Sequence, residues 1–119
     1  MRPKEVLKLW IEIFNKGEAE ALADLYAEEA INHQVVTEPV VGKNAILERV
    51  KEEFSLAKMV CIPENIFEDG EWVIMEWKDP KGFRGCGFFQ VVNSKIVFQR
   101  GYMDKLSFLK MNGLSTELN

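Results

Sequence analysis

The stretch that decides the fold is Gly82–Asp104, with the sequence GFRGCGFFQVVNSKIVFQRGYMD. The pair Asn93-Ser94 separates two runs rich in aromatic and β-branched residues, which predicts two adjacent strands joined by a tight turn. Glycine weakens a strand unless another group approaches its backbone closely, and glycines stand at positions 82, 85, 87 and 101. Glycines, aromatic residues and polar residues combined in this way predict a curved sheet with a pocket over it.

The composition is that of one ordinary globular domain. A chain of 119 residues fits a single domain, expected over residues 1–113 with a flexible tail at 114–119. The net charge of −4 and the absence of a basic patch argue against nucleic acid or an anionic membrane as partner. No apolar run is long enough for a membrane span, and no signal peptide is visible. Cys61 and Cys86 lack metal-ligand spacing, so we expect a reduced, cytoplasmic protein without a metal ion or cofactor.

Apolar residues at helical spacing predict three helices in the first half of the chain. They cover residues 3–16, residues 18–27 and the segment from Gly42 to about Ala57. In the third helix we assign the charged residues, Glu53 included, mainly to the solvent side and give them no function. The extended segment 30–41 contains the only histidine, His33.

Four strands are expected next, at 59–67, 72–78, 83–92 and 95–104, followed by a short helix at 106–111. Helices followed by an antiparallel meander define an α+β class. Pairing through the turns at Asp79–Gly82 and Asn93-Ser94 divides the side chains of the last three strands between two faces. One face is predicted to carry Val73, Met75, Trp77, Arg84, Cys86, Phe88, Gln90, Val97, Gln99 and Met103. The other is predicted to carry Trp72, Ile74, Glu76, Phe83, Gly85, Gly87, Phe89, Val91, Ile96, Phe98, Arg100 and Tyr102.

Both faces are too apolar to be simply solvated, and three helices can cover only one of them. We therefore predict a homodimer packed sheet to sheet through the second face. There Glu76, Arg100 and Tyr102 cluster around Gly85 and Gly87, and we expect an ion pair across the interface. With a register one residue off, this cluster would line the pocket instead. The alternative is a monomer whose curled sheet hides more of itself. The predicted dimer contacts are Phe89, Val91, Ile96 and Phe98.

Four short patterns together resemble one superfamily. They are Trp10-x-x-x-Phe14-Asn15-x-Gly17, Leu22-x-x-Leu25-Tyr26-Ala27-Glu28-Glu29-Ala30, Gly42-x-x-x-Ile46 and Gly101-Tyr102-Met103-Asp104. In this order they resemble the nuclear transport factor 2 superfamily, in its ketosteroid isomerase and SnoaL-like polyketide cyclase branch, over about residues 4–113. The resemblance implies a cone-shaped α+β barrel in which a curved, mostly antiparallel mixed sheet wraps around the N-terminal helices. It also implies an apolar pocket at the wide end and common dimers.

The resemblance argues against steroid isomerase chemistry. The tyrosine of that mechanism falls on Trp10, which has no hydroxyl, and the protonated acid falls on Phe88, which donates nothing. The base falls on His33 or on Gln34, depending on where a one-residue gap is placed. Isomerases, hydrolases, cyclases, dehydratases and non-catalytic binders share this fold, so the activity has to be argued from the site.

His33 is the predicted general base, because imidazole titrates near neutral pH. The alternative is a histidine hydrogen-bonded to Asn32, Gln34 or the backbone. The predicted partner is a hydrophobic small molecule, acted on without a cofactor by an isomerase, hydrolase or cyclase, or only bound by a non-catalytic module of the same fold. The predicted substrate-binding residues are Trp10, Gln34, Met75, Trp77, Arg84, Cys86, Phe88, Gln99 and Met103.

Overall fold

The computed structural model of the chain describes residues 1–115. The predicted tail, 114–119, therefore lies mostly outside the described residues. Four helices are present in this part: α1 (Pro3–Lys16), α2 (Ala19–Ala23), α3 (Lys43–Leu56) and α4 (Lys105–Met111). The strands are β1 (Tyr26–Gln34), β2 (Val40–Val41), β3 (Ile62–Asp69), β4 (Trp72–Lys78), β5 (Arg84–Val92) and β6 (Lys95–Met103).

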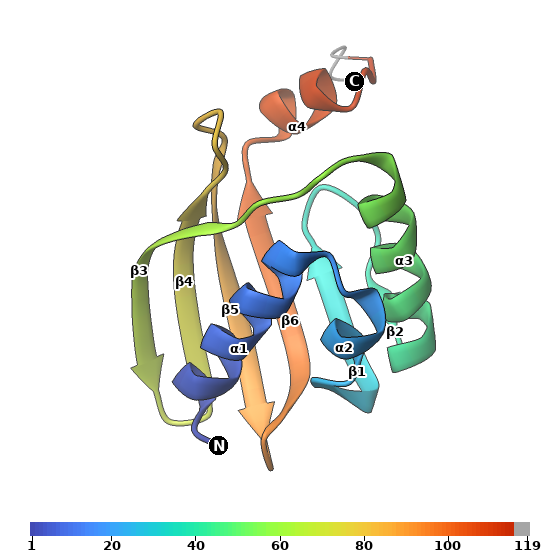
Figure 1. The fold of residues 1–119 in the computed structure, drawn as a ribbon. Helices are drawn as coiled ribbons and strands as arrows, with labels where there is room; N and C mark the ends of the chain where they lie inside the picture. Colours follow the sequence, from blue (N-terminus) through green and yellow to red (C-terminus); the bar gives the residue numbers. More distant parts are fainter. Residues whose placement is uncertain (116–119) are drawn as a thin grey trace.

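The six strands of the described residues form one sheet with the order β2-β1-β6-β5-β4-β3. All neighbours are antiparallel except β1 and β6, which run parallel. The predicted α+β class with a curved mixed sheet is confirmed, and the sheet remains open rather than closing into a full barrel (Figure 1).

One face of the sheet is covered by helices, and we call it the inner face. Figure 1 shows α1 lying across the sheet and α2 and α3 lying over the β1 side. In α1 the Glu5 carboxylate accepts a hydrogen bond from the Arg2 N–H (2.8 Å), and Gly17 ends the helix with a φ of 71°. The buried side chains of the core come from these helices and from the inner face of the strands: Val6, Leu7, Trp10, Leu22, Ile46, Val73, Met75, Phe89, Val91 and Ile96.

Within residues 1–115 no helix covers the opposite face, which we call the outer face. Its side chains include Trp72, Ile74, Phe88, Phe98, Arg100 and Tyr102, which follow from the strand register. The predicted register of β5 is wrong by one residue. Trp77 pairs with Gly85, and Lys78 with Arg84, whereas the turn rule paired Trp77 with Arg84.

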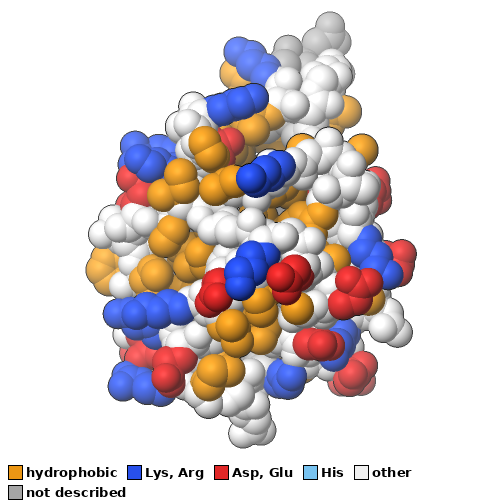
Figure 2. Space-filling model, in the orientation of Figure 1, with side chains coloured by type: hydrophobic (Ala, Val, Ile, Leu, Met, Phe, Trp, Pro, Cys, Tyr) orange, Lys and Arg blue, Asp and Glu red, His pale blue; other side chains and the backbone are white. Residues whose placement is uncertain are grey.

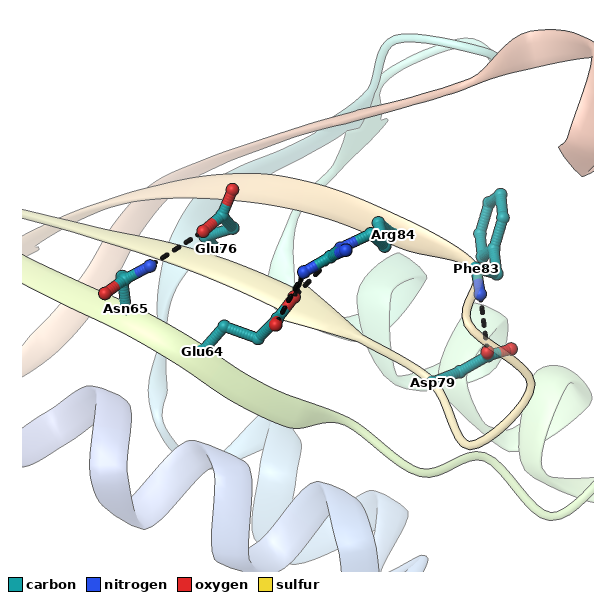
Figure 3. A network of polar contacts seen from close by, with 6 residues as sticks. All are labelled: Glu64, Asn65, Glu76, Asp79, Phe83 and Arg84. Carbon is teal, nitrogen blue, oxygen red and sulfur yellow. Dashed lines mark hydrogen bonds and ion pairs between the residues drawn. The ribbon is translucent and has the colours of Figure 1, made fainter.

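The cause of the register error is the length of the β4–β5 turn. The Asp79 carboxylate accepts hydrogen bonds from the N–H groups of Lys81 and Phe83 (2.9 Å each), so the turn includes Phe83 (Figure 3). Because side chains alternate along a strand, one extra turn residue moves every β5 side chain to the other face.

The observed register shows that most of the predicted dimer contacts are wrong. Phe89, Val91 and Ile96 are buried in the core, with exposed fractions of 1%, 5% and 0%. A register shift between Gln90 and Val91 brings Val91 beside Ile96 on the inner face. Only Phe98 of the predicted dimer contacts lies on the outer face.

The second predicted helix is shorter than expected. It ends at Ala23, and Tyr26 instead begins β1, where it pairs with Ile96 while the Leu25 carbonyl accepts a hydrogen bond from the Ile96 N–H (2.8 Å). At the other end of the sheet, β3 starts at Ile62 rather than residue 59. It is an edge strand with a register shift after Pro63, as the proline predicted.

Candidate functional site

A chain of hydrogen bonds crosses the core between α1 and the inner face of β1 and β6. The Trp10 indole N–H donates to the Tyr26 hydroxyl oxygen (3.0 Å), and the Tyr26 hydroxyl donates to the Gln99 side-chain carbonyl. All three residues are buried. Buried polar groups in an apolar core are retained where they are hydrogen-bonded, so this chain fixes the orientation of the Gln99 side chain.

Gln99 belongs to a cluster of three carboxamides, Asn32, Gln34 and Gln99, which we call the amide cluster. Asn32 and Gln99 are partners across the parallel β1–β6 pair. Gln34 Nε2 donates to Asn32 Oδ1 (2.9 Å). Gly101 makes room for Gln34, since a β-carbon there would lie 1.9 Å from Gln34 Oε1.

Two donors of the amide cluster remain free. The Gln99 carbonyl is engaged by Tyr26 and the Asn32 carbonyl by Gln34, so the amide N–H₂ groups of Gln99 and Asn32 are left. Within residues 1–115 neither amide nitrogen donates a hydrogen bond, and neither is a fully enclosed polar atom. Both are therefore donors that a bound molecule can use.

Aromatic and thioether side chains lie beside the amide cluster on the inner face. The Trp77 ring lies across Gly85 and makes an edge contact with Phe83, with ring centroids 5.6 Å apart. Met103 pairs with Gly85 on the next strand, and Met103, Trp77 and Gln34 are only half-buried. In Figure 2 hydrophobic side chains gather at the surface in the upper part of the view, near α4, with Lys and Arg side chains around them.

Glu53 is half-buried on the core-facing side of α3, three residues after the buried Val50, contrary to its predicted place among the solvent-facing charges. Burial is the main cause that raises the pKa of its carboxyl group, which Glu52 raises further and Arg49 lowers. Burial also raises the pKa of the Tyr26 hydroxyl, and the charge of Glu53 adds to that rise against the lowering effect of the Trp10 hydrogen bond.

The thiol of Cys61 packs in the core, with its Sγ 3.8 Å from the Met75 Sδ. Burial raises the pKa of this thiol to about 11, so it stays protonated and unreactive at neutral pH. Cys61 and Cys86 are both free cysteines.

His33 lies on the outer face, not among the interior groups. It pairs with Arg100, while its neighbours Asn32 and Gln34 point inward. The role predicted for His33 as a base inside the pocket does not fit this position, and Gln34 is the one of the two that faces inward. Beside it, Arg100 places its guanidinium over the Phe98 ring (4.8 Å) and leaves its buried Nε without a partner in the described residues.

The predicted substrate-binding residues divide between the two faces. Arg84, Cys86 and Phe88 lie on the outer face because of the β5 register. Figure 3 shows the Arg84 side chain turned toward Glu64, with Nε 3.0 Å and Nη2 2.6 Å from its carboxylate oxygens. The members on the inner face or packed against it are Trp10, Gln34, Met75, Trp77, Gln99 and Met103.

Three polar residues of the interior were not among the predicted site residues: Tyr26, Asn32 and Glu53. For two of them the spacing in the sequence could have indicated an inward-facing side chain. Asn32 stands two residues before Gln34 in one strand, and Glu53 follows Val50 by three residues on the buried side of α3. For Tyr26 no spacing indicated this, because it lies inside a stretch that reads as helix.

Two hollows on the surface lie away from the amide cluster. One runs along α3 and β2, lined by Val40, Ala45, Glu48, Arg49, Lys51, Glu52 and Ser55. The other is lined by Ala27, Glu28, Glu29, Ala30 and Val97. Among residues 1–115 no group of three or more His, Cys, Asp or Glu side chains is placed to hold a metal ion, and no helix there is long and apolar enough to cross a membrane.

An open, curved mixed sheet with helices on its inner face defines an NTF2-like α+β protein, and solved structures agree. A putative polyketide cyclase from Xanthomonas campestris matches with a TM-score of 0.81 and 16% identity, covering 92% of this chain and 95% of that one. An NTF2-like protein of unknown function from Cytophaga hutchinsonii matches at 0.80 and 13%, covering 92% and 96%. The epoxide hydrolase/cyclase-like enzyme SalBIII, of pyran ring formation in polyether salinomycin, matches at 0.78 and 18%, covering 86% and 90%.

The sequence itself places the chain in a family. The family model of the SnoaL-like domain matches residues 7–99, and the chain belongs to this family. No curated protein matches it significantly. The resemblance predicted from the short patterns is confirmed.

Proposed function

We propose that the inner face binds a hydrophobic small molecule through an oxygen acceptor, and that the protein acts on it as a cofactor-independent isomerase, hydrolase or cyclase. The observation that carries the proposal is the Gln99 amide, which Tyr26 holds in one orientation with its N–H₂ group free. Donors fixed in advance stabilise charge that develops on a substrate oxygen without a cost of reorganisation. The free N–H₂ of Asn32 on the neighbouring strand supplies a second donor.

Further support comes from the surroundings of the amide cluster and from the related structures. Trp77 and Met103 offer apolar surface to a ring or chain, as ligand sites typically do. SalBIII is described as epoxide hydrolase/cyclase-like and the Xanthomonas protein as a putative polyketide cyclase. We propose a reaction of one of these classes for this protein, without a cofactor. A steroid isomerase is not proposed, because Trp10 has no hydroxyl to offer and Phe88 lies on the outer face.

Binding is tested with 2-tetralone, a hydrophobic ketone, against tetralin, which has the same rings without the oxygen. We expect 2-tetralone to shift the NMR signals of the Gln99 and Asn32 side-chain amides. We expect Gln99→Leu to weaken its binding by roughly three- to tenfold, the value of one hydrogen bond, while tetralin binding stays unchanged. Gln90→Leu is the matched control, since Gln90 pairs with Trp72 and Phe98 on the outer face. Equal losses in both variants, or no shift of either amide, would contradict the proposal.

We also propose that the protein is a homodimer through the outer face. In the part of the chain that the structure describes, no helix lies over that face, and it exposes apolar side chains, with exposed fractions of 63% for Phe67, 64% for Val41 and 45% for Tyr102. Exposed apolar side chains on an uncovered sheet face are typical of an interface.

The dimer is tested by charge. We expect Tyr102→Glu to weaken dimerisation by roughly a hundredfold, because it places an unpaired charge in the interface, as measured by sedimentation equilibrium. Leu56→Glu is the control, since Leu56 is 78% exposed on α3 and away from the outer face. A wild-type protein that sediments as a monomer at micromolar concentration would remove this proposal and leave the inner-face proposal intact.

A further inference from the structure

One end of the molecule carries α4, and we call it the α4 end. Figure 1 shows the β4–β5 turn and the C-terminal end of α3 at the same end as α4. The strand register agrees with this view. Lys78 pairs with Arg84, and the next residue, Gly85, pairs with Met103, which precedes α4 by two positions. Segments that are far apart in the sequence therefore meet at this end.

Exposed apolar side chains are concentrated at the α4 end. None of the residues of α4 is buried. The Val35 N–H donates to the Gly101 carbonyl (3.0 Å), which places the loop after β1 beside the end of β6. Among residues 1–115 nine large apolar side chains are exposed, and five of them belong to this end: Val35, Leu56, Leu106, Met111 and Leu114. The α4 end is thus a second exposed apolar surface, separate from the outer face.

Lysine side chains accompany these apolar residues. Figure 2 shows Lys and Arg side chains around the hydrophobic ones in the upper part of the view. Within residues 1–115 the exposed lysines of the α4 end take part in no ion pair: Lys58, Lys81, Lys105 and Lys110. Their ammonium groups are therefore available to an external anion.

The carboxylates of the same end are mostly engaged within the protein. Asp79 accepts hydrogen bonds from the backbone of its own turn, and Asp104 accepts one from the Ser107 N–H (2.8 Å). Glu64 is held by Arg84, which leaves Glu38 as the exposed acid of the loop after β1. The net charge of −4 predicted no anionic membrane as partner, but a sum over the chain does not show that lysines gather at one end.

The residue types at the α4 end fit a lipid surface better than a protein. Protein interfaces are enriched in aromatic residues and arginine and depleted in lysine. At a membrane, the flexible stem of a lysine lies along apolar groups while its ammonium group reaches the lipid phosphates. Exposed aliphatic side chains between such lysines enter the boundary between head groups and acyl chains.

We propose that the α4 end binds the surface of an anionic lipid bilayer. Its exposed aliphatic side chains enter the head-group boundary, and its four exposed lysines contact the lipid phosphates. The protein stays on the surface, since no helix of residues 1–115 is long and apolar enough to cross a membrane. The contact uses neither the amide cluster nor the outer face, so the proposals for those two regions do not depend on it.

The test is co-sedimentation with phosphatidylcholine vesicles that contain either no phosphatidylglycerol or about 30% of it. We expect at least about tenfold tighter binding to the anionic vesicles, and loss of this difference in about 0.5 M salt, which screens the charges. Lys105→Gln combined with Lys110→Gln should weaken binding to the anionic vesicles roughly twentyfold, because each lysine near such a surface contributes about fivefold.

The matched control is Lys4→Gln combined with Lys8→Gln, which changes the net charge equally. Both lysines are exposed in the first half of α1, and the Lys4 N–H donates to Glu68 (2.8 Å), at the opposite end of β3 from Ile62. This variant should keep the wild-type affinity within about twofold, since distant charges are screened. Equal losses in the two double variants, or no binding to the anionic vesicles, would overturn the proposal.

Leu106→Ser combined with Met111→Ser distinguishes a lipid surface from an acidic protein. Neither side chain is buried, so the variant should fold as wild type does. We expect roughly tenfold weaker binding to the anionic vesicles, because less apolar surface enters the bilayer. Soluble polyglutamate is the probe for an acidic protein. If it binds as tightly as the vesicles, or if the serine substitutions leave vesicle binding unchanged, the lipid proposal is overturned.

Discussion

Phe89→Ala is expected to lower the free energy of unfolding by about 4 kcal/mol, the largest effect of any substitution considered for this chain. The Phe89 side chain is 1% exposed and sits at the centre of the core, edge-on to Trp10 with ring centroids 5.3 Å apart. It also covers Gly87, whose missing β-carbon would lie 3.2 Å from the Phe89 ring. Alanine would leave a cavity bordered by a helix on one side and a sheet on the other, neither of which can collapse to fill it.

The adjacent phenylalanine provides the control. Phe88 is half-buried on the outer face and contacts Tyr102, with ring centroids 5.9 Å apart. We expect Phe88→Ala to cost about 1 kcal/mol, as a partly exposed site permits, in urea unfolding at one fixed protein concentration. The register predicted from the turn alone places Phe88 on the inner face and Phe89 on the outer face, the reverse of the observed positions. A larger loss for Phe88→Ala would therefore contradict the observed β4–β5 pairing.

The elements could be read from the sequence because each depends on local patterning. The apolar spacing of α1, the alternation in β4 and the turn at Asn93-Ser94 all appear where local rules place them. Tyr26 shows the limit of such rules. Its segment reads as helix, but pairing with Ile96, far along the chain, draws it into β1.

The site was harder to predict than the fold, for a geometric reason. Which residue of a strand faces inward depends on counting residues through a turn, and the Asp79–Phe83 turn holds one residue more than a four-residue turn. Because the prediction left this residue out of the turn, it assigned Arg84 to the wrong face. The choice between His33 and Gln34 depended in the same way on the pairing of β1 with β6, which no local pattern reveals.

Glu53 illustrates a different limit. A helical wheel of α3 places it beside Val50, but a run of charged residues around it favours the interpretation of a solvated face. Whether Glu53 faces solvent or the core depends on which residues pack against that side of α3. The charge of Glu53 acts on Tyr26, and the sequence assigned Tyr26 to another kind of element. One misplaced residue thus concealed both the hydrogen-bond chain and the carboxylate near it.

Gly85→Ala is expected to lower the free energy of unfolding by about 3 kcal/mol, the upper part of the usual range for overpacking. A β-carbon at Gly85 would lie 2.3 Å from the Trp77 Cζ2 and 2.8 Å from the Tyr102 carbonyl oxygen. Trp77 cannot simply swing away, because it packs against Phe83, and the carbonyl belongs to the paired strand β6. Calorimetric unfolding measures the loss.

Gly87→Ala is the matched control for this substitution. There the added carbon meets only the Phe89 ring, at 3.2 Å, and a shift of a few tenths of an ångström relieves the contact, so we expect a loss of about 1 kcal/mol. Equal losses at the two positions would show that the Trp77 ring does not lie across Gly85. Two glycines of this hairpin are therefore required for different reasons: Gly85 makes room for the Trp77 ring, and Gly101 makes room for the Gln34 amide. Gly85→Ala therefore changes the apolar wall of the inner face, and Gly101→Ala would change its donors and acceptors.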